Sequence, residues 1–303
     1  MTTIIRRGRS GIHSPAGKAT QCRTARNVAD VSSSVVTQRS ALGDLVRYWR
    51  RVRAMSQLDL AVAASTTPRY MSFVETGRAH ASREMVLRLA VALDVPLRDR
   101  NGLLVAAGFA PIYPEHGIEH PAVERVMAAL DRVLEQHAPY PAVVMDRRWD
   151  VVRVNSGAAR LFADLCAPEP VPDPANVLRL MLEPGPVRAA VGNWDEVAPS
   201  LLERARREAV GGVMDLTTAE LVQRLRTGDD AAVFAAAPRS ITSLIPVVDV
   251  RFAHGGTTLR WFSVISTIGT PVDVTAQELR LEAFFPSDDE TAARWELISA
   301  TSR

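Results

Sequence analysis

Residues 57–77 read QLDLAVAASTTPRYMSFVETG, and this stretch predicts two short helices joined by a tight turn. Ser56 precedes the first helix, and its hydroxyl can accept a hydrogen bond from an unpaired amide of the first turn. Thr67 is placed to cap the second helix, with Pro68 at the first helical position, where a missing N–H removes no hydrogen bond. The rest of the chain is expected to position or control this helix pair.

The second helix has an inward and an outward side. Met71 and Val74 lie three residues apart and are expected to face inward. A short capped helix with an exposed Arg, Ser and Phe is typical of proteins that read the DNA major groove. The residues on the outward side are Pro68, Arg69, Ser72 and Phe73.

The same stretch resembles the helix-turn-helix of phage repressors and Cro proteins (the XRE family), which has the pattern Ser-Gln-x-x-Leu-Ala, a turn and then Glu-x-Gly-Arg. Ser65 departs from this pattern, because the family usually has Gly in the turn. A left-handed backbone at Ser65 costs about 1 kcal/mol, which a domain tolerates. The matching residues are Ser56, Gln57, Leu60, Ala61, Glu75, Gly77 and Arg78.

The resemblance and the outward side of the helix together suggest which residues contact DNA and which residues are structural. By the family's spacing, Arg50 reaches Glu75 in a buried pair that fixes the reading helix, so Glu75 is expected to be structural. Gln57 would bridge a DNA phosphate and the reading helix, and Arg69 is the chief candidate for guanine O6 and N7. Thr66, Thr67, Arg78 and Arg83 are expected at DNA phosphates, and Phe73 is expected at a thymine methyl group. The predicted DNA-binding set is Gln57, Thr66, Thr67, Pro68, Arg69, Ser72, Phe73, Arg78 and Arg83.

Charge is unevenly distributed along the 303 residues. Residues 1–40 carry seven basic and one acidic side chain, and residues 41–110 carry ten and six. Residues 111–303 carry nineteen basic and twenty-seven acidic side chains. The front of the chain is therefore net positive by ten and the back net negative by eight, which predicts a polyanionic partner for the front.

Composition and periodicity divide the chain into four parts. Residues 1–40 are basic and rich in Ser and Thr, which predicts a mostly disordered tail, either a basic arm on DNA or a solvated extension. Residues 41–110 predict an all-α DNA-binding domain of five helices. Residues 111–136 predict a linker and a connecting helix, which either packs on the next domain or makes a dimer contact. Residues 137–300 predict a second, mixed domain.

Five runs in the second domain predict an antiparallel sheet. Asn155 or Ser156 is placed to cap a helix directly after the second run. A hairpin that enters a helix through Asn resembles the opening of a PAS domain, an α+β fold with a five-stranded antiparallel sheet and helices. The run around Trp261 is apolar on both faces, so the sheet is expected to be covered on both sides. The runs are 142–145, 151–154, 246–252, 258–267 and 278–285.

Residues 41–300 as a whole resemble the MmyB-like (MltR-type) transcription regulators, which join a repressor-type helix-turn-helix to a PAS-like ligand-binding domain. The resemblance rests on segments such as TPRYMSFVETGRA, YPAVVMDRRWDVVRVN, NWDEVA and TLRWFSVISTIGTPVDVTAQELRLEAFF. It implies a bound apolar, fatty-acid-like molecule, with Arg179 or Arg260 as candidates for an acid headgroup. The predicted lining residues are Val143, Met145, Phe162, Leu182, Trp194, Trp261, Ile265 and Phe285.

Several other classes of protein are disfavoured. No phosphate-binding Gly loop or G-x-S-x-G motif occurs, so an enzyme is not expected, and no cofactor is predicted beyond a bound fatty acid. Cys22 and Cys166 are too few for a disulfide framework or a zinc site. His116 and His120 are four residues apart, but Gly117 and Pro121 interrupt a helix there, so no metal site is predicted. Without an apolar run of eighteen residues or a signal peptide, we expect a cytoplasmic protein with no membrane contact.

The sequence thus predicts a homodimeric, ligand-responsive transcription regulator that binds double-stranded DNA at a pseudo-palindromic operator. The alternative is a DNA-binding regulator whose C-terminal domain serves dimerisation or protein-partner binding without a small ligand.

Overall fold

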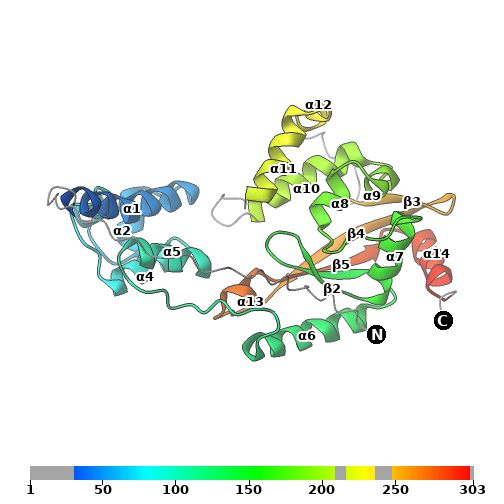
Figure 1. Ribbon diagram of the computed structural model, residues 1–303, viewed down its shortest axis with the longest axis horizontal. Helices are drawn as coiled ribbons and strands as arrows, with labels where there is room; N and C mark the ends of the chain where they lie inside the picture. The colour runs from blue at the N-terminus through cyan, green and yellow to red at the C-terminus, as the bar shows by residue number, and fades with distance from the viewer. Residues whose placement is uncertain (1–30, 209–215, 236–247, 301–303) are drawn as a thin grey trace, which may run out of the picture. The chain divides into compact units, whose positions relative to one another are not determined.

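The computed structural model describes residues 31–208, 216–235 and 248–300. The chain divides between Tyr113 and Pro114 into two compact units, each of which is described by itself (Figure 1). Residues 1–30 of the predicted tail lie outside the described residues. Residues 31–40 belong to the first helix, so the predicted tail is wrong for this part. A helix that already exists extends at little cost, even through a Ser-rich segment that shows no apolar period.

The described part of the N-terminal unit, from Val31 on, is built from five helices, as the sequence predicts. Its core contains Val46 and Trp49 from the first helix and Met71 and Val74 from the third, all almost fully buried. Leu89 of the fourth helix packs with them at zero exposure. The helices are α1 (Val31–Val52), α2 (Gln57–Ala63), α3 (Pro68–Glu75), α4 (Arg83–Ala92) and α5 (Leu97–Ala106).

The turn between α2 and α3 has the left-handed residue that the family pattern requires. Ser65 has a φ of 52°, so this position adopts the left-handed backbone although it lacks the usual Gly. The Thr66 amide donates to the Ala61 carbonyl at 2.8 Å, which closes the end of α2. The predicted turn geometry is therefore confirmed at Ser65.

The predicted linker is held on both sides of the division between the units. The Asn101 side chain donates to the Tyr113 carbonyl at 2.8 Å and accepts from the Tyr113 amide at 3.1 Å. The next residue, Pro114, accepts a hydrogen bond from the Val274 amide at 2.9 Å. His116 Nδ1 lies 2.8 Å from the carboxylate of Asp273. The segment is thus bonded at both ends.

The C-terminal unit contains a five-stranded antiparallel sheet in the order β2-β1-β5-β4-β3. The α+β PAS-like prediction and all five strands are confirmed, although the third strand begins at Val250 and the first residues of its predicted run lie outside the described residues. The strands are β1 (Ala142–Met145), β2 (Val151–Val154), β3 (Val250–His254), β4 (Thr257–Thr267) and β5 (Arg280–Pro286).

One face of the sheet carries the larger core. Figure 1 shows the helices α7 to α12 on this side of the sheet. Val143 and Met145 of β1 and Trp261 of β4 pack here against the helices, with Trp295 of α14 beside Trp261. The helices after β2 are α7 (Ser156–Cys166), α8 (Val177–Leu182), α9 (Pro186–Ala190), α10 (Trp194–Glu208), α11 (Leu216–Thr227), α12 (Ala231–Ala235), α13 (Val274–Glu278) and α14 (Asp289–Ala300).

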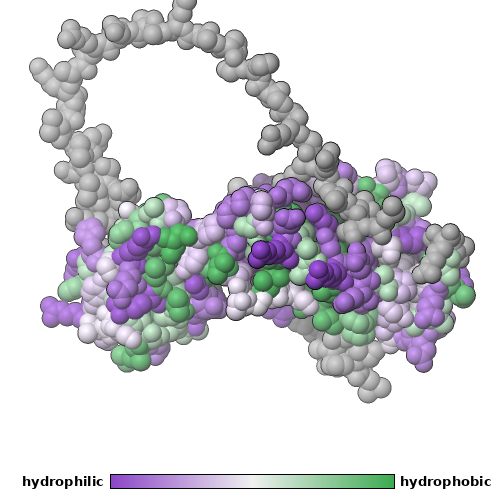
Figure 2. Space-filling model, turned by 90° about the horizontal axis from the view of Figure 1, so that it is seen from below, coloured by the Kyte–Doolittle hydropathy of each residue, from purple (hydrophilic) through white to green (hydrophobic). Residues whose placement is uncertain are grey.

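The opposite face is covered by the connecting helix α6 (Pro121–His137). Val123, Met127, Leu130 and Leu134 of this helix are buried against Val144 and the neighbouring strand residues. The α6 side of the unit faces the viewer in Figure 2, where hydrophilic residues alternate with isolated hydrophobic ones. Of the two predicted roles of this helix, packing on the domain is the one observed, and the expectation of a sheet covered on both faces is met.

Asn155 joins β2 to α7 through four hydrogen bonds. Its Oδ1 accepts from the amides of Ala142 and Ala158 at 3.0 and 2.9 Å. Its Nδ2 donates to the carbonyls of Leu134 and Tyr140 at 3.1 and 2.8 Å. Asn155, and not Ser156, is therefore the helix cap, and it ties the sheet to α6 as well as to α7.

Replacing Asn155 with Ala removes the partner of four backbone groups in a buried site. We expect the free energy of unfolding of this unit to fall by about 2–4 kcal/mol. Urea unfolding of the full chain, followed by tryptophan fluorescence, measures the change. Ser156→Ala, at the neighbouring exposed position, should change stability by less than about 0.5 kcal/mol. Similar losses in the two variants would contradict the assignment of the cap.

Candidate functional site

The outward side of α3 is presented by local capping and by burial of the other side. Thr67 Oγ1 accepts from the Tyr70 amide at 3.2 Å, and Pro68 occupies the first turn. Arg69 is exposed and Phe73 is half-buried, with the Arg69 guanidinium 5.5 Å from the centre of the Phe73 ring. This cation–π contact holds the Arg69 side chain along the surface of the helix.

The inner end of α3 is fixed by Glu75, which is only 3% exposed. Arg50 Nε donates to Glu75 Oε1 at 2.6 Å, and Arg50 Nη2 donates to Oε2 at 3.1 Å. Gln57 Nε2 donates to the same Oε2 at 2.8 Å. The predicted Arg50–Glu75 pair is present, and Gln57 reaches the reading helix as predicted, whereas its phosphate contact stays a prediction.

The balance of forces at Glu75 favours the charged carboxylate. Burial by itself raises the pKa of Glu75, but the hydrogen bonds from Arg50 and Gln57 and the charges of Arg50 and Arg47 outweigh it, so its pKa lies below the usual value. The hydrogen bond that Arg50 donates to Glu75 likewise raises the pKa of Arg50. Both groups are therefore charged at neutral pH.

Arg47 and Gly43 were not among the predicted site residues, yet both contact the end of α3. Arg47 Nη2 donates to the Glu75 backbone carbonyl at 2.6 Å. A Cβ atom on Gly43 would lie 2.5 Å from that same oxygen, so only Gly lets α1 approach so closely. Arg47 lies one helical turn before Arg50, which is the sequence signal that could have found it.

The nine predicted DNA-binding residues come from three helices and the loops between them. Gln57 begins α2, the Thr and Pro residues form the turn and start of α3, and Arg83 begins α4. Arg69, Arg78 and Arg83 are exposed, whereas Ser72 and Thr66 are half-buried. Their contact with DNA stays a prediction.

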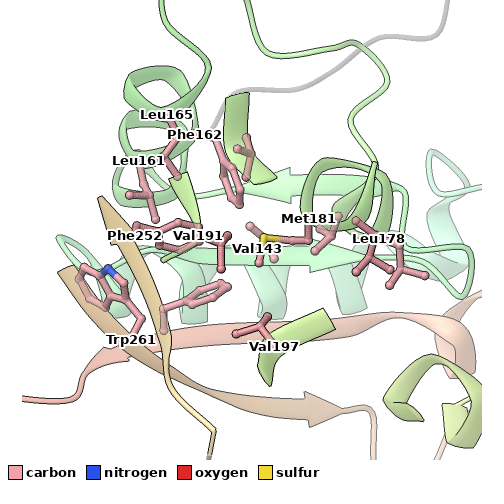
Figure 3. Packing of buried hydrophobic residues seen from close by; sticks show 14 of the residues in the cluster. Val143, Leu161, Phe162, Leu165, Leu178, Met181, Val191, Val197, Phe252 and Trp261 are labelled. Carbon is pink, nitrogen blue, oxygen red and sulfur yellow. The ribbon is translucent and has the colours of Figure 1, made fainter. Parts of the chain in front are cut away.

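In the C-terminal unit the structure brings together most of the predicted lining residues, but not all. Val143, Met145, Phe162, Leu182 and Trp261 are buried in the larger core, and Trp194 packs against it. Figure 3 shows Phe162 from α7, Met181 from α8 and Val143 from β1 converging above the sheet. Phe285 instead packs on the α6 face. Ile265 is 38% exposed.

Four charged residues also lie on the larger-core face, and the sequence reasoning did not single them out. Arg204 of α10 forms a two-pronged ion pair with Glu282 of β5, at 2.8 and 3.1 Å, and donates to Glu208 at 2.7 Å. The fourth member is Arg280 of β5. Burial lowers the pKa of Arg204, but Glu282 and Glu208 raise it above its usual value. Charged residues at alternate positions of a buried strand were the available signal.

The two predicted headgroup cations lie elsewhere. Arg179 is exposed and lines a hollow of about 430 Å³ together with Arg148, Asp150, Asn176 and Glu183. Arg260 is half exposed, with its Nε 3.8 Å from Asp288. Neither residue lies in the larger core.

The described ranges hold no group of three or more His, Cys, Asp or Glu residues that could bind a metal ion. His116 and His120 stack on each other with their ring centres 3.9 Å apart, and His116 contacts Asp273. Within these same ranges, no helix is both long and apolar enough to span a membrane.

Replacing Glu75 with Gln leaves the Arg50 guanidinium without its counter-charge. We expect the N-terminal unit to lose about 3 kcal/mol of unfolding free energy at neutral pH. Because the folded pKa is lowered, the contribution of Glu75 is complete above about pH 4.3 and is lost as the pH falls through the folded value. Urea unfolding followed by circular dichroism over pH measures both effects. The exposed-site variant Glu84→Gln is the control, and equal stabilities of the two variants would contradict the role of Glu75.

Replacing Arg69 with Ala should relax sequence preference more than it weakens binding. A lost guanine contact reduces discrimination against a point-mutated operator by roughly 1–3 kcal/mol. Arg78→Ala, at a predicted phosphate contact, should instead weaken binding to all sequences and reduce the salt dependence by about one counterion. Gel-shift titrations of the operator and of its point-mutated version, at several salt concentrations, measure these effects. Unchanged selectivity in Arg69→Ala would refute base reading by this residue.

Solved structures with some similarity to the chain include two of the clp gene regulator ClgR from Corynebacterium glutamicum. The two structures share 31% and 28% sequence identity with this chain. The matches cover 23% and 34% of this chain and 88% and 95% of the ClgR chains, and both TM-scores are 0.21. An RNA-binding light-oxygen-voltage receptor shares 11% identity over 93% of this chain and 70% of its own, with a TM-score of 0.22. We base no inference on these overlaps, because the TM-scores are low.

The comparison with curated proteins gives no match. Comparison with protein families gives two, which confirm the resemblance found in the sequence. A helix-turn-helix domain matches residues 41–103, and the MmyB-like transcription regulator ligand binding domain matches residues 126–298. Since the second match alone spans more than half of the chain, the chain belongs to the MmyB-like transcription regulators.

Proposed function

We propose that this chain is a transcription regulator that binds a specific DNA sequence through α3 and responds to an apolar, fatty-acid-like ligand in its C-terminal unit. The observation that carries the proposal is the arrangement around α3. Glu75 locks the inner end of the helix to Arg50 and Gln57, while Arg69 remains exposed on the outer side. A rigid helix with an exposed guanidinium is suited to two-pronged contact with guanine.

The regulator acts as a homodimer on a pseudo-palindromic operator. Two copies of α3 would enter the major groove at half-sites about one DNA turn apart, as is usual for helix-turn-helix proteins. The ligand changes DNA affinity by binding one arrangement of the dimer more tightly than another. No catalytic step is required for this role.

An apolar ligand supplies enough binding energy for such a switch. Burial of each methylene contributes about 0.8 kcal/mol, so a chain of about a dozen carbons provides on the order of 10 kcal/mol before ordering costs. The buried aliphatic and aromatic residues of the larger core, with Val143, Phe162 and Trp261 among them, offer the surroundings that such a chain needs.

A second function is favoured by the packing of that core. Val143, Met145, Leu182 and Trp261 are at most 1% exposed, so these residues already fill one another's space. In this alternative the C-terminal unit serves dimerisation or protein-partner binding without a small ligand. The exposed apolar residues Val264 and Ile265 on β4 would suit such a contact.

Mass spectrometry of solvent extracts from the purified full chain distinguishes the two functions. The ligand-responsive function predicts a bound apolar molecule and an increase in melting temperature of about 5–10 °C when dodecanoic acid is added at a hundredfold excess over its Kd. Glucose serves as a polar control and should cause no shift. Sequencing of genomic fragments bound with and without the extracted lipid then tests regulation. An empty extract together with no thermal shift would support the partner function.

A further inference from the structure

Three of the four charged residues on the larger-core face have short hydrogen bonds, because Glu208 Oε1 also accepts from Arg204 at 2.7 Å, whereas Arg280 does not. Glu282 accepts two hydrogen bonds from Arg204, whose guanidinium also lies 4.4 Å from the centre of the Trp149 ring. Within the described residues, Arg280 makes one long hydrogen bond, at 3.3 Å, to the Glu208 backbone carbonyl. Its Nη1 lies 3.4 Å from Glu208 Oε2. Among the described residues, neither of these two buried atoms has a hydrogen-bond partner.

A guanidinium in this state is costly for the protein. The Arg280 side chain is only 13% exposed, so water replaces few of its lost hydrogen bonds. Buried cations are stable when several hydrogen bonds and a counter-charge satisfy them. Arg280 therefore has N–H donors that can bind a carboxylate. The side chain of Glu208, at the end of α10, contacts these donors with poor geometry.

The surroundings of Arg280 are apolar on one side and open on another. Met145 of β1 lies directly across from Arg280 and is fully buried. Thr267 of β4 lies across from it on the other side and is exposed. Ile265, one position along the same face, pairs with Glu282 and is 38% exposed. The exposed side chains of Ile265 and Thr267 are therefore the side from which we expect an amphipathic molecule to approach Arg280.

We propose that Arg280 binds the carboxylate of the apolar ligand and that this carboxylate displaces the side chain of Glu208. The inference rests on the ligand-responsive function proposed above. It assigns the headgroup site to β5 and not to either of the cations that the sequence suggested, Arg179 and Arg260. Displacement of Glu208 also removes the contact between Glu208 of α10 and Arg280 of β5, while Arg204 of the same helix stays paired with Glu282.

Calorimetric titration of the full chain with dodecanoic acid and 1-dodecanol tests this site. The wild type should bind the acid at least about tenfold more tightly than the alcohol. Arg280→Gln should lose that preference while its affinity for the alcohol stays the same. Glu208→Gln removes the competing carboxylate, so it should tighten binding of the acid severalfold and leave the alcohol unaffected.

Arg294→Gln on α14 is the matched control, because Arg294 is exposed, and it should behave as the wild type. Equal binding of acid and alcohol to the wild type would overturn the headgroup site and leave the apolar ligand in place. Loss of acid preference in Arg179→Gln or Arg260→Gln, with Arg280→Gln unaffected, would move the site to one of those residues. Should Arg280→Gln fail to fold, an unchanged acid affinity in Glu208→Gln would reject the displacement. No binding of either probe would overturn both the site and the ligand-responsive function.

Discussion

The position of α3 depends on one buried carboxylate, that of Glu75. α3 has eight residues, and a helix of that length is not stable alone in water, so other elements must determine its orientation. Glu75 ends the helix, where the macrodipole is already negative, and a buried carboxylate there is unfavourable without donors. Arg50 from α1 and Gln57 from α2 supply them. Three helices are therefore fixed by the requirement to satisfy one charge.

The C-terminal unit follows the same principle. Apolar side chains such as Val143 and Met145 pack in many arrangements of similar energy, so they drive burial without choosing one geometry. Buried polar groups are more selective, because each needs a partner in one direction. Asn155 holds the sheet between α6 and α7, and Arg204 holds α10 on Glu282 of β5. These few contacts determine how the helices lie on the sheet.

The sequence predicts features that depend on neighbouring residues better than features that depend on distant ones. The cap at Thr67 and the left-handed turn at Ser65 are local, and both are observed. The strands are also local, but the alternation of residues along a strand shows only which residues share a face. It does not show which helices cover that face. Phe285 and Ile265 were therefore predicted beside Trp261, whereas the register puts Phe285 on the α6 face and leaves Ile265 half open. The contacts of Arg280 need the fold itself, because α10 and β5 are far apart in sequence.

The chain is held by hydrogen bonds just before and just after the division between the units. Asn101 holds the backbone of Tyr113 on one unit, and the next residue, Pro114, is bonded to Val274 of α13 on the other. α13 ends at Glu278, two residues before Arg280. A carboxylate on Arg280 would therefore act beside the anchor of the chain that leads to the DNA-binding unit. The ligand can change the free energy of DNA binding by no more than the difference between its own binding free energies for the two arrangements of the dimer.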